Sequence, residues 1–142
     1  MSVEENLKLI DTGLEAYNAH DWDRFFDGYA ESVVNYAPDL PEPIKGLAAL
    51  RERFETNETA FPDHHMEKVR AFGQGDYVVV ETVWKGTHKG PMQGPKGETI
   101  PATNKSVQGP IALVFKIEEG KVTEEHDYWD QLATLSQLGL AW

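Results

Sequence analysis

The sequence predicts an α+β fold in which N-terminal helices cover the concave face of a curled antiparallel sheet, so that the sheet forms a cone with an open mouth. Two observations lead to this prediction. Apolar residues recur at helical spacing through the first part of the chain, and long strand-like runs separated by turn residues fill most of the rest. The length of 142 residues is typical of one domain, so residues 1–142 are expected to form a single domain around one core.

The first helix is predicted from residue 3 to about residue 19. Ser2 followed by Glu5 is a capping-box pattern that would begin it. Its apolar residues recur at steps of three and four and form a single stripe: Val3, Leu7, Ile10, Leu14 and Tyr17.

Two shorter helices and a brief strand are predicted next. Asp21 can cap a helix that buries Trp22, Phe25 and Phe26. A strand is expected at residues 33–37, followed by the turn-rich segment 38–43. Gly46 would then open a third helix that runs to about Thr59. Its inward-facing residues would be Leu47, Leu50, Phe54 and Ala60.

Strand signals dominate from residue 64 onward. The predicted strands are residues 64–73, 77–88, 105–118 and 121–128, and neighbours joined by short turns should pair antiparallel. Residues 86–97 are expected to form a long hairpin connection rather than a linker. A closing helix over residues 131–138 would end at Gly139, the preferred residue just past a helix C-terminus.

The composition excludes several kinds of partner. The formal net charge of −11 would repel nucleic acid and anionic membranes, so neither is expected as a partner. The chain has no cysteine and therefore no disulfide, thiolate metal site or cysteine nucleophile. The first residues lack a basic and an apolar region, and no later run is long enough to span a membrane, which favours a cytoplasmic protein.

Two aspartates interrupt an aromatic-rich segment near the C-terminus. Burial against aromatic rings raises the pKa of a carboxyl toward the range in which it exchanges protons near neutral pH. Asp127 falls inside the last strand, where it either faces inward, opposite to its neighbours His126 and Tyr128, or points outward to water. Asp130 directly precedes the last helix, so it is either the N-cap of that helix or a second chemical group.

Other polar and aromatic residues are candidates for the same cavity. Alternation places His88 on the strand face that carries Trp84, where it would look into the cone or merely hydrogen-bond a backbone carbonyl. Asn35 and Tyr36 could donate hydrogen bonds into the cavity, and Tyr17 or Trp22 could form its wall.

Metal, nucleotide and serine-hydrolase chemistry are poorly supported by the sequence. Adjacent strand residues point to opposite faces, so His64 and His65 cannot easily bind one ion and no metal is expected. No glycine-rich phosphate cradle and no Gly-x-Ser-x-Gly elbow is present. The acidic residues Glu118, Glu119, Glu124 and Glu125 are interpreted as a solvated hairpin edge.

With these residues in place, the chain resembles the SnoaL-like polyketide cyclases of the nuclear-transport-factor-2-like superfamily. The order and spacing of several short segments carry the resemblance over nearly the whole chain: residues 17–21 (YNAHD), Gly46, residues 61–63 (FPD), residues 86–90 (GTHKG), residues 119–122 (EGKV), residues 127–130 (DYWD) and residues 137–139 (QLG). The resemblance implies an α+β cone with a deep pocket.

The resemblance also implies roles for particular residues. The aspartate that serves the cyclases as general acid and base of an intramolecular aldol condensation falls on Asp127, their strand-end histidine on His88, and their early-strand asparagine on Asn35. A second histidine of the antibiotic cyclases corresponds to Leu113, so that donor is missing here.

Two hypotheses of function follow. The first is a cofactor-independent cyclase or isomerase of a hydrophobic carbonyl compound, with Asp127 as acid and base, His88 and Asn35 holding an oxygen, and Trp84 and Trp129 packing on the substrate. The second is a non-catalytic protein that binds a small apolar ligand, or an assembly module that uses the outer face of the sheet. Because the family commonly pairs through that outer face, a homodimer is expected.

Overall fold

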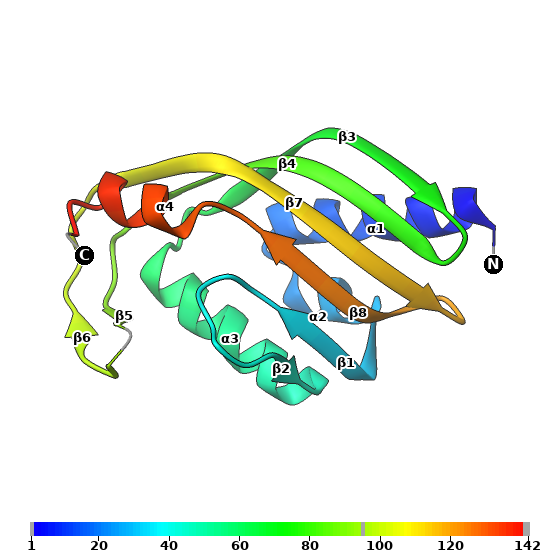
Figure 1. Ribbon diagram of the computed structural model, residues 1–142, viewed down its shortest axis with the longest axis horizontal. Coiled ribbons are helices and arrows are strands. Elements are labelled where there is room, and N and C mark those ends of the chain that lie inside the picture. The colour runs from blue at the N-terminus through cyan, green and yellow to red at the C-terminus, as the bar shows by residue number, and fades with distance from the viewer. Residues whose placement is uncertain (1, 95, 141–142) are drawn as a thin grey trace.

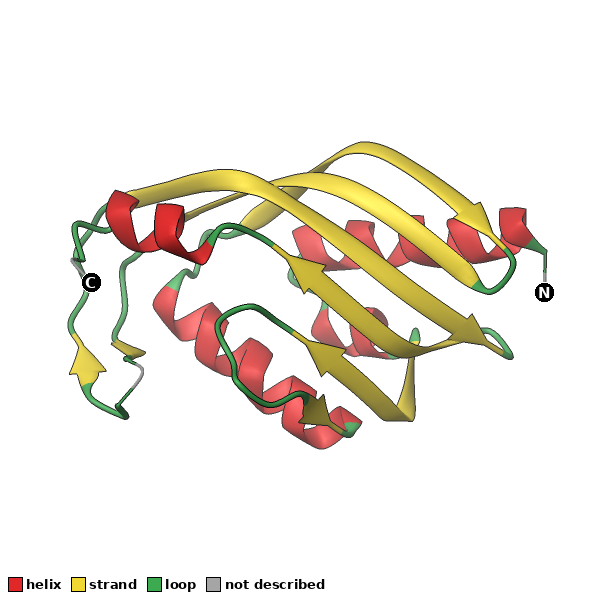
Figure 2. Cartoon of the chain, viewed as in Figure 1, coloured by secondary structure: helices red, strands yellow, loops and turns green. Residues whose placement is uncertain are grey.

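A curled six-stranded sheet arches over the N-terminal helices in the computed structural model, which describes residues 2–94 and 96–140 (Figure 1). The helices are α1 (Val3–Asn18), α2 (Trp22–Phe26), α3 (Leu47–Ala60) and α4 (Gln131–Gln137). The strands of the main sheet are β1 (Tyr29–Tyr36), β2 (Ile44–Lys45), β3 (His65–Gln74), β4 (Tyr77–Thr87), β7 (Ser106–Glu118) and β8 (Lys121–Tyr128). The first three helices lie on one side of this sheet, which confirms the predicted fold class (Figure 2).

The strand order β2-β1-β8-β7-β4-β3 places β1, the first strand of the chain, beside β8, the last. The pairs β3–β4, β4–β7 and β7–β8 are antiparallel, as predicted. In contrast, β1 runs parallel to β8 and places Asn35 opposite Glu125. The pairing of β1 with β8 therefore brings residues from the first and last strands to the same place.

Helix ends follow the local signals in the sequence. Both hydrogen bonds of the capping box between Ser2 and Glu5 are present, at 3.1 and 3.2 Å. Asp130 Oδ1 accepts a hydrogen bond from the Ala133 amide at 3.0 Å, so Asp130 is the N-cap of α4. Gly139 follows α4 with a φ of 72°, a left-handed conformation that glycine adopts without strain.

The first strand and the long connection differ from the prediction. Strand β1 begins at Tyr29 rather than at residue 33. Its register against β8 shifts between Tyr29 and Val34, so these first residues lack the regular alternation by which a strand is predicted. The connection between β4 and β7 contains a small separate hairpin of β5 (Met92–Gln93) and β6 (Thr99–Ile100).

An aromatic core fills the space between the helices and the sheet. Phe25 and Phe26 pack on Phe54 of α3, with ring centroids 5.2 and 5.3 Å apart. Leu50 is fully buried on the same helix. Burying each such side chain stabilises the fold by roughly 1.5–3 kcal/mol. Among the described residues, none of the helices has the length and apolar character needed to cross a membrane.

Candidate functional site

A cavity of about 1320 Å³ lies between the concave face of the sheet and the helices. Most of its exposed lining is apolar, as is usual for a site that takes a small hydrophobic molecule. Five of the residues selected from the sequence line it: Tyr17, Asn35, Trp84, Asp127 and Trp129. The cavity is therefore the place where their side chains can act together.

Asp127 faces inward from β8 into this cavity. Its Oδ2 accepts a hydrogen bond from the Asn35 side-chain amide at 3.2 Å. Its Oδ1 is buried and has no hydrogen-bond partner among residues 2–94 and 96–140. Burial raises the pKa of Asp127, while polar contacts with Glu125 and Asn35 oppose that rise. Asp127 is thus a desolvated carboxyl in the cavity wall, with Oδ2 bound by Asn35 and Oδ1 without a hydrogen-bond partner among the described residues.

Glu125 is buried, and its assignment to a solvated hairpin edge is wrong. Its residue is 4% exposed, and its Oε1 accepts a hydrogen bond from the Tyr29 hydroxyl. The cause is period-two alternation, which puts Glu125 and Asp127 on the same face of β8. Burial first, and then the charge of Asp127, raise the pKa of Glu125 well above its ordinary value. Two buried carboxyls this close share a proton rather than both ionising.

His88 is not one of the described residues that line the cavity. The expectation that it looks into the cone beside Trp84 is therefore corrected. Its Nδ1 accepts a hydrogen bond from the Thr103 amide at 3.2 Å and lies 3.0 Å from the Thr103 hydroxyl. Phe61 packs against it, with ring centroids 5.4 Å apart. His88 shares a strand face with Trp84, but it lies past the end of β4, where the Thr103 segment covers it. Burial lowers the pKa of His88.

Tyr36 lies on the opposite face of the sheet, so the expectation that it reaches the cavity is wrong. Its ring stacks on His126 with centroids 4.3 Å apart and an interplanar angle of 5°, and Tyr36 is 39% exposed. The reason is the alternation of β1, which turns Tyr36 outward because its neighbour Asn35 faces inward.

Leu113 lines the cavity on β7, directly opposite Asp127 in the strand register. The family histidine that is missing from the sequence would therefore have stood beside the aspartate. An apolar side chain in that position leaves Asp127 without an imidazole neighbour on β7.

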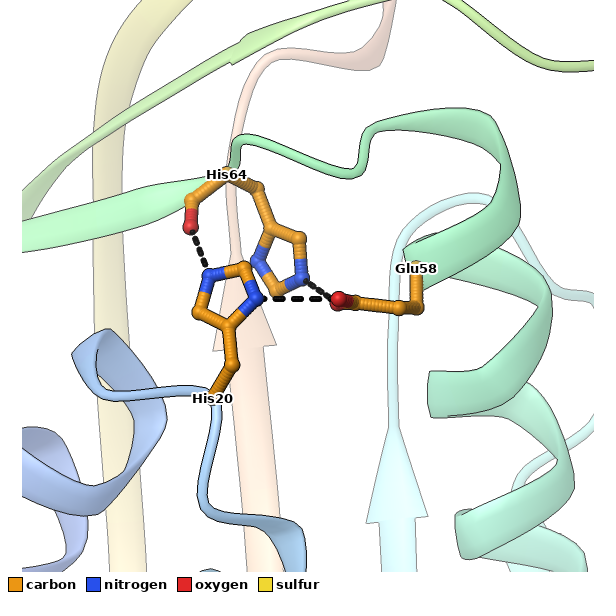
Figure 3. Close-up of side chains that lie close together, drawn as sticks. All are labelled: His20, Glu58 and His64. Atoms are coloured by element: carbon orange, nitrogen blue, oxygen red, sulfur yellow. Dashed lines mark hydrogen bonds and ion pairs between the residues drawn. The ribbon is translucent and has the colours of Figure 1, made fainter.

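A second polar cluster forms part of another wall of the cavity, and no pattern in the sequence predicted it. Tyr17 and His64 both line the cavity, and the Tyr17 hydroxyl lies 2.5 Å from His64 Nδ1. His64 Nε2 lies 2.6 Å from Glu58 Oε2, and His20 Nδ1 lies 2.9 Å from Glu58 Oε1 (Figure 3). Trp84 donates its indole N–H to the Tyr17 oxygen at 3.0 Å.

This cluster is also the group of described residues best placed to hold a cation. One ligand atom from each of His20, Glu58 and His64 lies within 4.8 Å of the others. His64 meets partners other than His65 here: His20 follows α1, Glu58 lies on α3, and His64 itself directly precedes β3. No local spacing in the sequence indicates their proximity.

Comparison with known proteins gives the family. Residues 8–138 match the family model described as SnoaL-like polyketide cyclase. The aklanonic acid methyl ester cyclase DauD of Streptomyces sp. (strain C5) is 26% identical over 146 residues, which cover 99% of this chain and 85% of the cyclase. The nogalonic acid methyl ester cyclase of Streptomyces nogalater is 28% identical over 131 residues, which cover 83% of this chain and 91% of the cyclase.

A solved structure shows the same fold. TsrD from Streptomyces laurentii superposes with a TM-score of 0.82 at 21% identity, and the match covers 99% of each chain. The family match over residues 8–138 includes the whole of the sheet and most of the helices that surround the cavity. The chain therefore belongs to the SnoaL-like polyketide cyclase family.

Proposed function

We propose that the protein is a cofactor-independent cyclase that acts on a hydrophobic, polyketide-like carbonyl compound, with Asp127 as general acid and base. One observation carries the proposal: Asp127 lines the cavity, and its Oδ1 is buried and has no hydrogen-bond partner among the described residues. A desolvated carboxylate with a free oxygen can accept a proton from carbon. The relatives named as methyl ester cyclases support this reaction type.

The proposed reaction is an intramolecular aldol condensation. The Asp127 carboxylate removes a proton alpha to a carbonyl, and the resulting enolate carbon attacks an aldehyde or ketone in the same molecule. The new alkoxide then takes a proton back from the Asp127 carboxyl. Asn35 holds Oδ2 of the carboxylate in place, while Trp84 and Trp129 offer aromatic surfaces to the substrate's rings.

Replacing Asp127 by Asn tests the proposal. The Asp127→Asn variant should lower turnover of a polycyclic keto substrate by roughly 10²–10⁴-fold, the usual effect of losing a general acid and base. Asp130→Asn is the matched control, because Asn caps a helix as well as Asp does and the change is the same. Unchanged turnover in Asp127→Asn, with its thermal unfolding intact, would rule the assignment out.

A non-catalytic ligand-binding role is the second candidate, and Leu113 is the observation that favours it. The apolar side chain in the place of the family histidine removes a proton donor beside Asp127. If the protein only binds its ligand, Asp127→Asn and the wild type should bind that ligand equally and neither should convert it.

We also propose a cytoplasmic homodimer that pairs through the outer face of the sheet. Tyr36 and Tyr128 expose 39% and 57% of their surface there, and both rings stack on His126. Aromatic side chains are enriched where protein surfaces meet.

A further inference from the structure

A continuous series of hydrogen-bonding groups leads from solvent to the cavity through His20, Glu58, His64 and Tyr17. Figure 3 shows the first three of these side chains. The outer members are partly exposed: the side chains of His20 and Glu58 are 27% and 32% accessible. Glu58 also lines a smaller hollow of about 300 Å³ beside α2 and α3. The inner members, His64 and Tyr17, are buried and line the cavity.

The donors and acceptors of these side chains determine which kind of hydrogen bond Tyr17 can form with a ligand. An indole N–H can only donate, so Trp84 occupies one lone pair of the Tyr17 oxygen. A neutral imidazole has one donor and one acceptor nitrogen, and the Glu58 carboxylate requires the donor at His64 Nε2. His64 Nδ1 is then the acceptor, and Tyr17 donates its proton to it. Toward the cavity Tyr17 presents its remaining lone pair, which accepts a hydrogen bond.

Neighbouring groups shift the pKa of His64 and hold its hydrogen-bond partner Glu58 in position. Burial lowers the pKa of His64; Glu58 and Asp63 raise it, and His20 lowers it further. Both nitrogens of His20 face oxygens, Glu58 Oε1 and the His64 carbonyl, each at 2.9 Å. His20 therefore holds Glu58 and the His64 backbone in position through both of its ring nitrogens. His20 makes these contacts from a left-handed backbone with a φ of 54°, which is uncommon for a residue with a side chain.

We propose that Tyr17, His64 and Glu58 form a second proton-transfer site in the cavity, which takes a proton from a phenol or enol hydroxyl of the ligand. The ligand hydroxyl gives its proton to the Tyr17 oxygen while Tyr17 passes its own proton to His64 Nδ1, and Glu58 stabilises the imidazolium. The ligand becomes a phenolate or enolate, and the reverse transfer restores the resting state. Glu58 and His20 act as positioning residues.

The transfer is concerted because Tyr17 resists becoming a free phenolate. Burial and the charges of Glu58, Asp127 and Glu125 raise the pKa of the Tyr17 hydroxyl. Tyr17 and Asp127 line the same cavity, so both proton-transfer sites act within it. This inference rests on the proposed function only in its substrate class: a carbonyl compound that also carries an acidic hydroxyl group.

Binding of two probes that cannot cyclise tests the inference. Calorimetry would compare 2-hydroxyanthraquinone with 2-methoxyanthraquinone, which lacks the hydroxyl proton. The wild type should bind the hydroxy probe roughly 2- to 10-fold more tightly, the usual effect of one hydrogen bond. The bound hydroxy probe should also show phenolate absorption below the pH at which it ionises in water.

Matched variants assign the effect to Tyr17 and His64. Tyr17→Phe should abolish both the preference and the phenolate absorption, whereas Tyr36→Phe, the same change on the outer face, should leave both intact. His64→Gln should remove the phenolate absorption even if the probe still binds. Neither probe can cyclise, so both signals are independent of turnover, and a failure of the cyclase proposal would not be mistaken for a failure of this one.

Two results would overturn the inference. The first is equal affinity for the two probes in the wild type, or a preference that persists in Tyr17→Phe. The second is saturable binding of Zn²⁺ at micromolar concentration that His20→Ala abolishes, because His20, Glu58 and His64 would then hold a metal ion in place of the proton.

Discussion

Asn35 and Asp127 are 92 residues apart in the sequence, yet the Asn35 amide donates a hydrogen bond to Asp127 Oδ2 at 3.2 Å. The bond spans β1 and β8, the parallel pair of the sheet. It fixes Oδ2 of the carboxyl and leaves Oδ1 without a hydrogen-bond partner among the described residues. The orientation of the proposed acid and base therefore depends on a strand pairing that joins the first and last strands.

Asn35→Leu removes this hydrogen bond at nearly constant volume. The contact with Asn35 lowers the pKa of Asp127, so its loss should raise that pKa further. The basic form of Asp127 would then appear at higher pH, and the acid limb of kcat/KM should move to higher pH. The buried carboxyl loses a partner, so the free energy of unfolding should fall by roughly 1–3 kcal/mol. An acid limb that stays in place would show that Asp127 is not the titrating base.

Glu125→Gln should change how stability depends on pH. The folded-state pKa values of Glu125 and Asp127 are raised, so the native state binds more protons than the unfolded state at any pH between their ordinary values near 4 and the raised values. The free energy of unfolding should therefore fall as pH rises through that window. Glu125→Gln should reduce this fall, whereas the exposed Glu15→Gln should not. Urea unfolding at pH 5 and pH 8 measures the difference, and equal slopes in wild type and Glu125→Gln would contradict the shared proton.

His88→Ala should affect stability more than turnover. The side chain is fully buried and bonded to Thr103, outside the cavity lining among the described residues. Its removal should cost roughly 2–5 kcal/mol of unfolding free energy, as for other large-to-small changes in a core. Turnover of the folded variant should stay within about tenfold of wild type. A loss of 10²–10⁴-fold in kcat without loss of stability would instead make His88 a catalytic residue.

The double change Tyr36→Lys and Tyr128→Lys tests the proposed dimer. Light scattering of the wild type should give twice the chain mass of 16.0 kDa, and the variant should approach the single-chain value, because two charges would have to be buried at the interface. Leu132→Lys is the control, since Leu132 is equally exposed but lies on α4. A wild type of 16.0 kDa would refute the dimer.

Local signals in the sequence were sufficient for much of the fold. The apolar stripe and capping box predicted α1, and a turn residue between two strand-like runs predicted the hairpin of β7 and β8. The sequence left two roles open for Asp130, an N-cap or a second chemical group. The hydrogen bond that Asp130 accepts from the Ala133 amide identifies it as the N-cap. Each of these features depends on residues within a few positions of one another, which is why spacing alone reveals them.

Strand alternation predicted which residues share a face, but not what that face meets. It separated Asp127 from His126 without showing which of the two faced inward, and it was not applied to Asn35 and Tyr36, which were both expected in the cavity. It grouped His88 with Trp84, but could not show that the cavity ends before His88. Glu125 shared the face of Asp127, yet its position in an acidic run favoured an exposed edge.

By itself, the sequence determined the α+β class, the helix caps and the position of Asp127 in the last strand, because these follow from short-range periodicity and capping. Tertiary structure alone decided the two polar clusters, in which Tyr29 meets Glu125 and Tyr17 meets His64. The physical reason is distance along the chain: the partners are 96 and 47 residues apart, and only the closure of the sheet over the helices places their side chains within hydrogen-bonding reach.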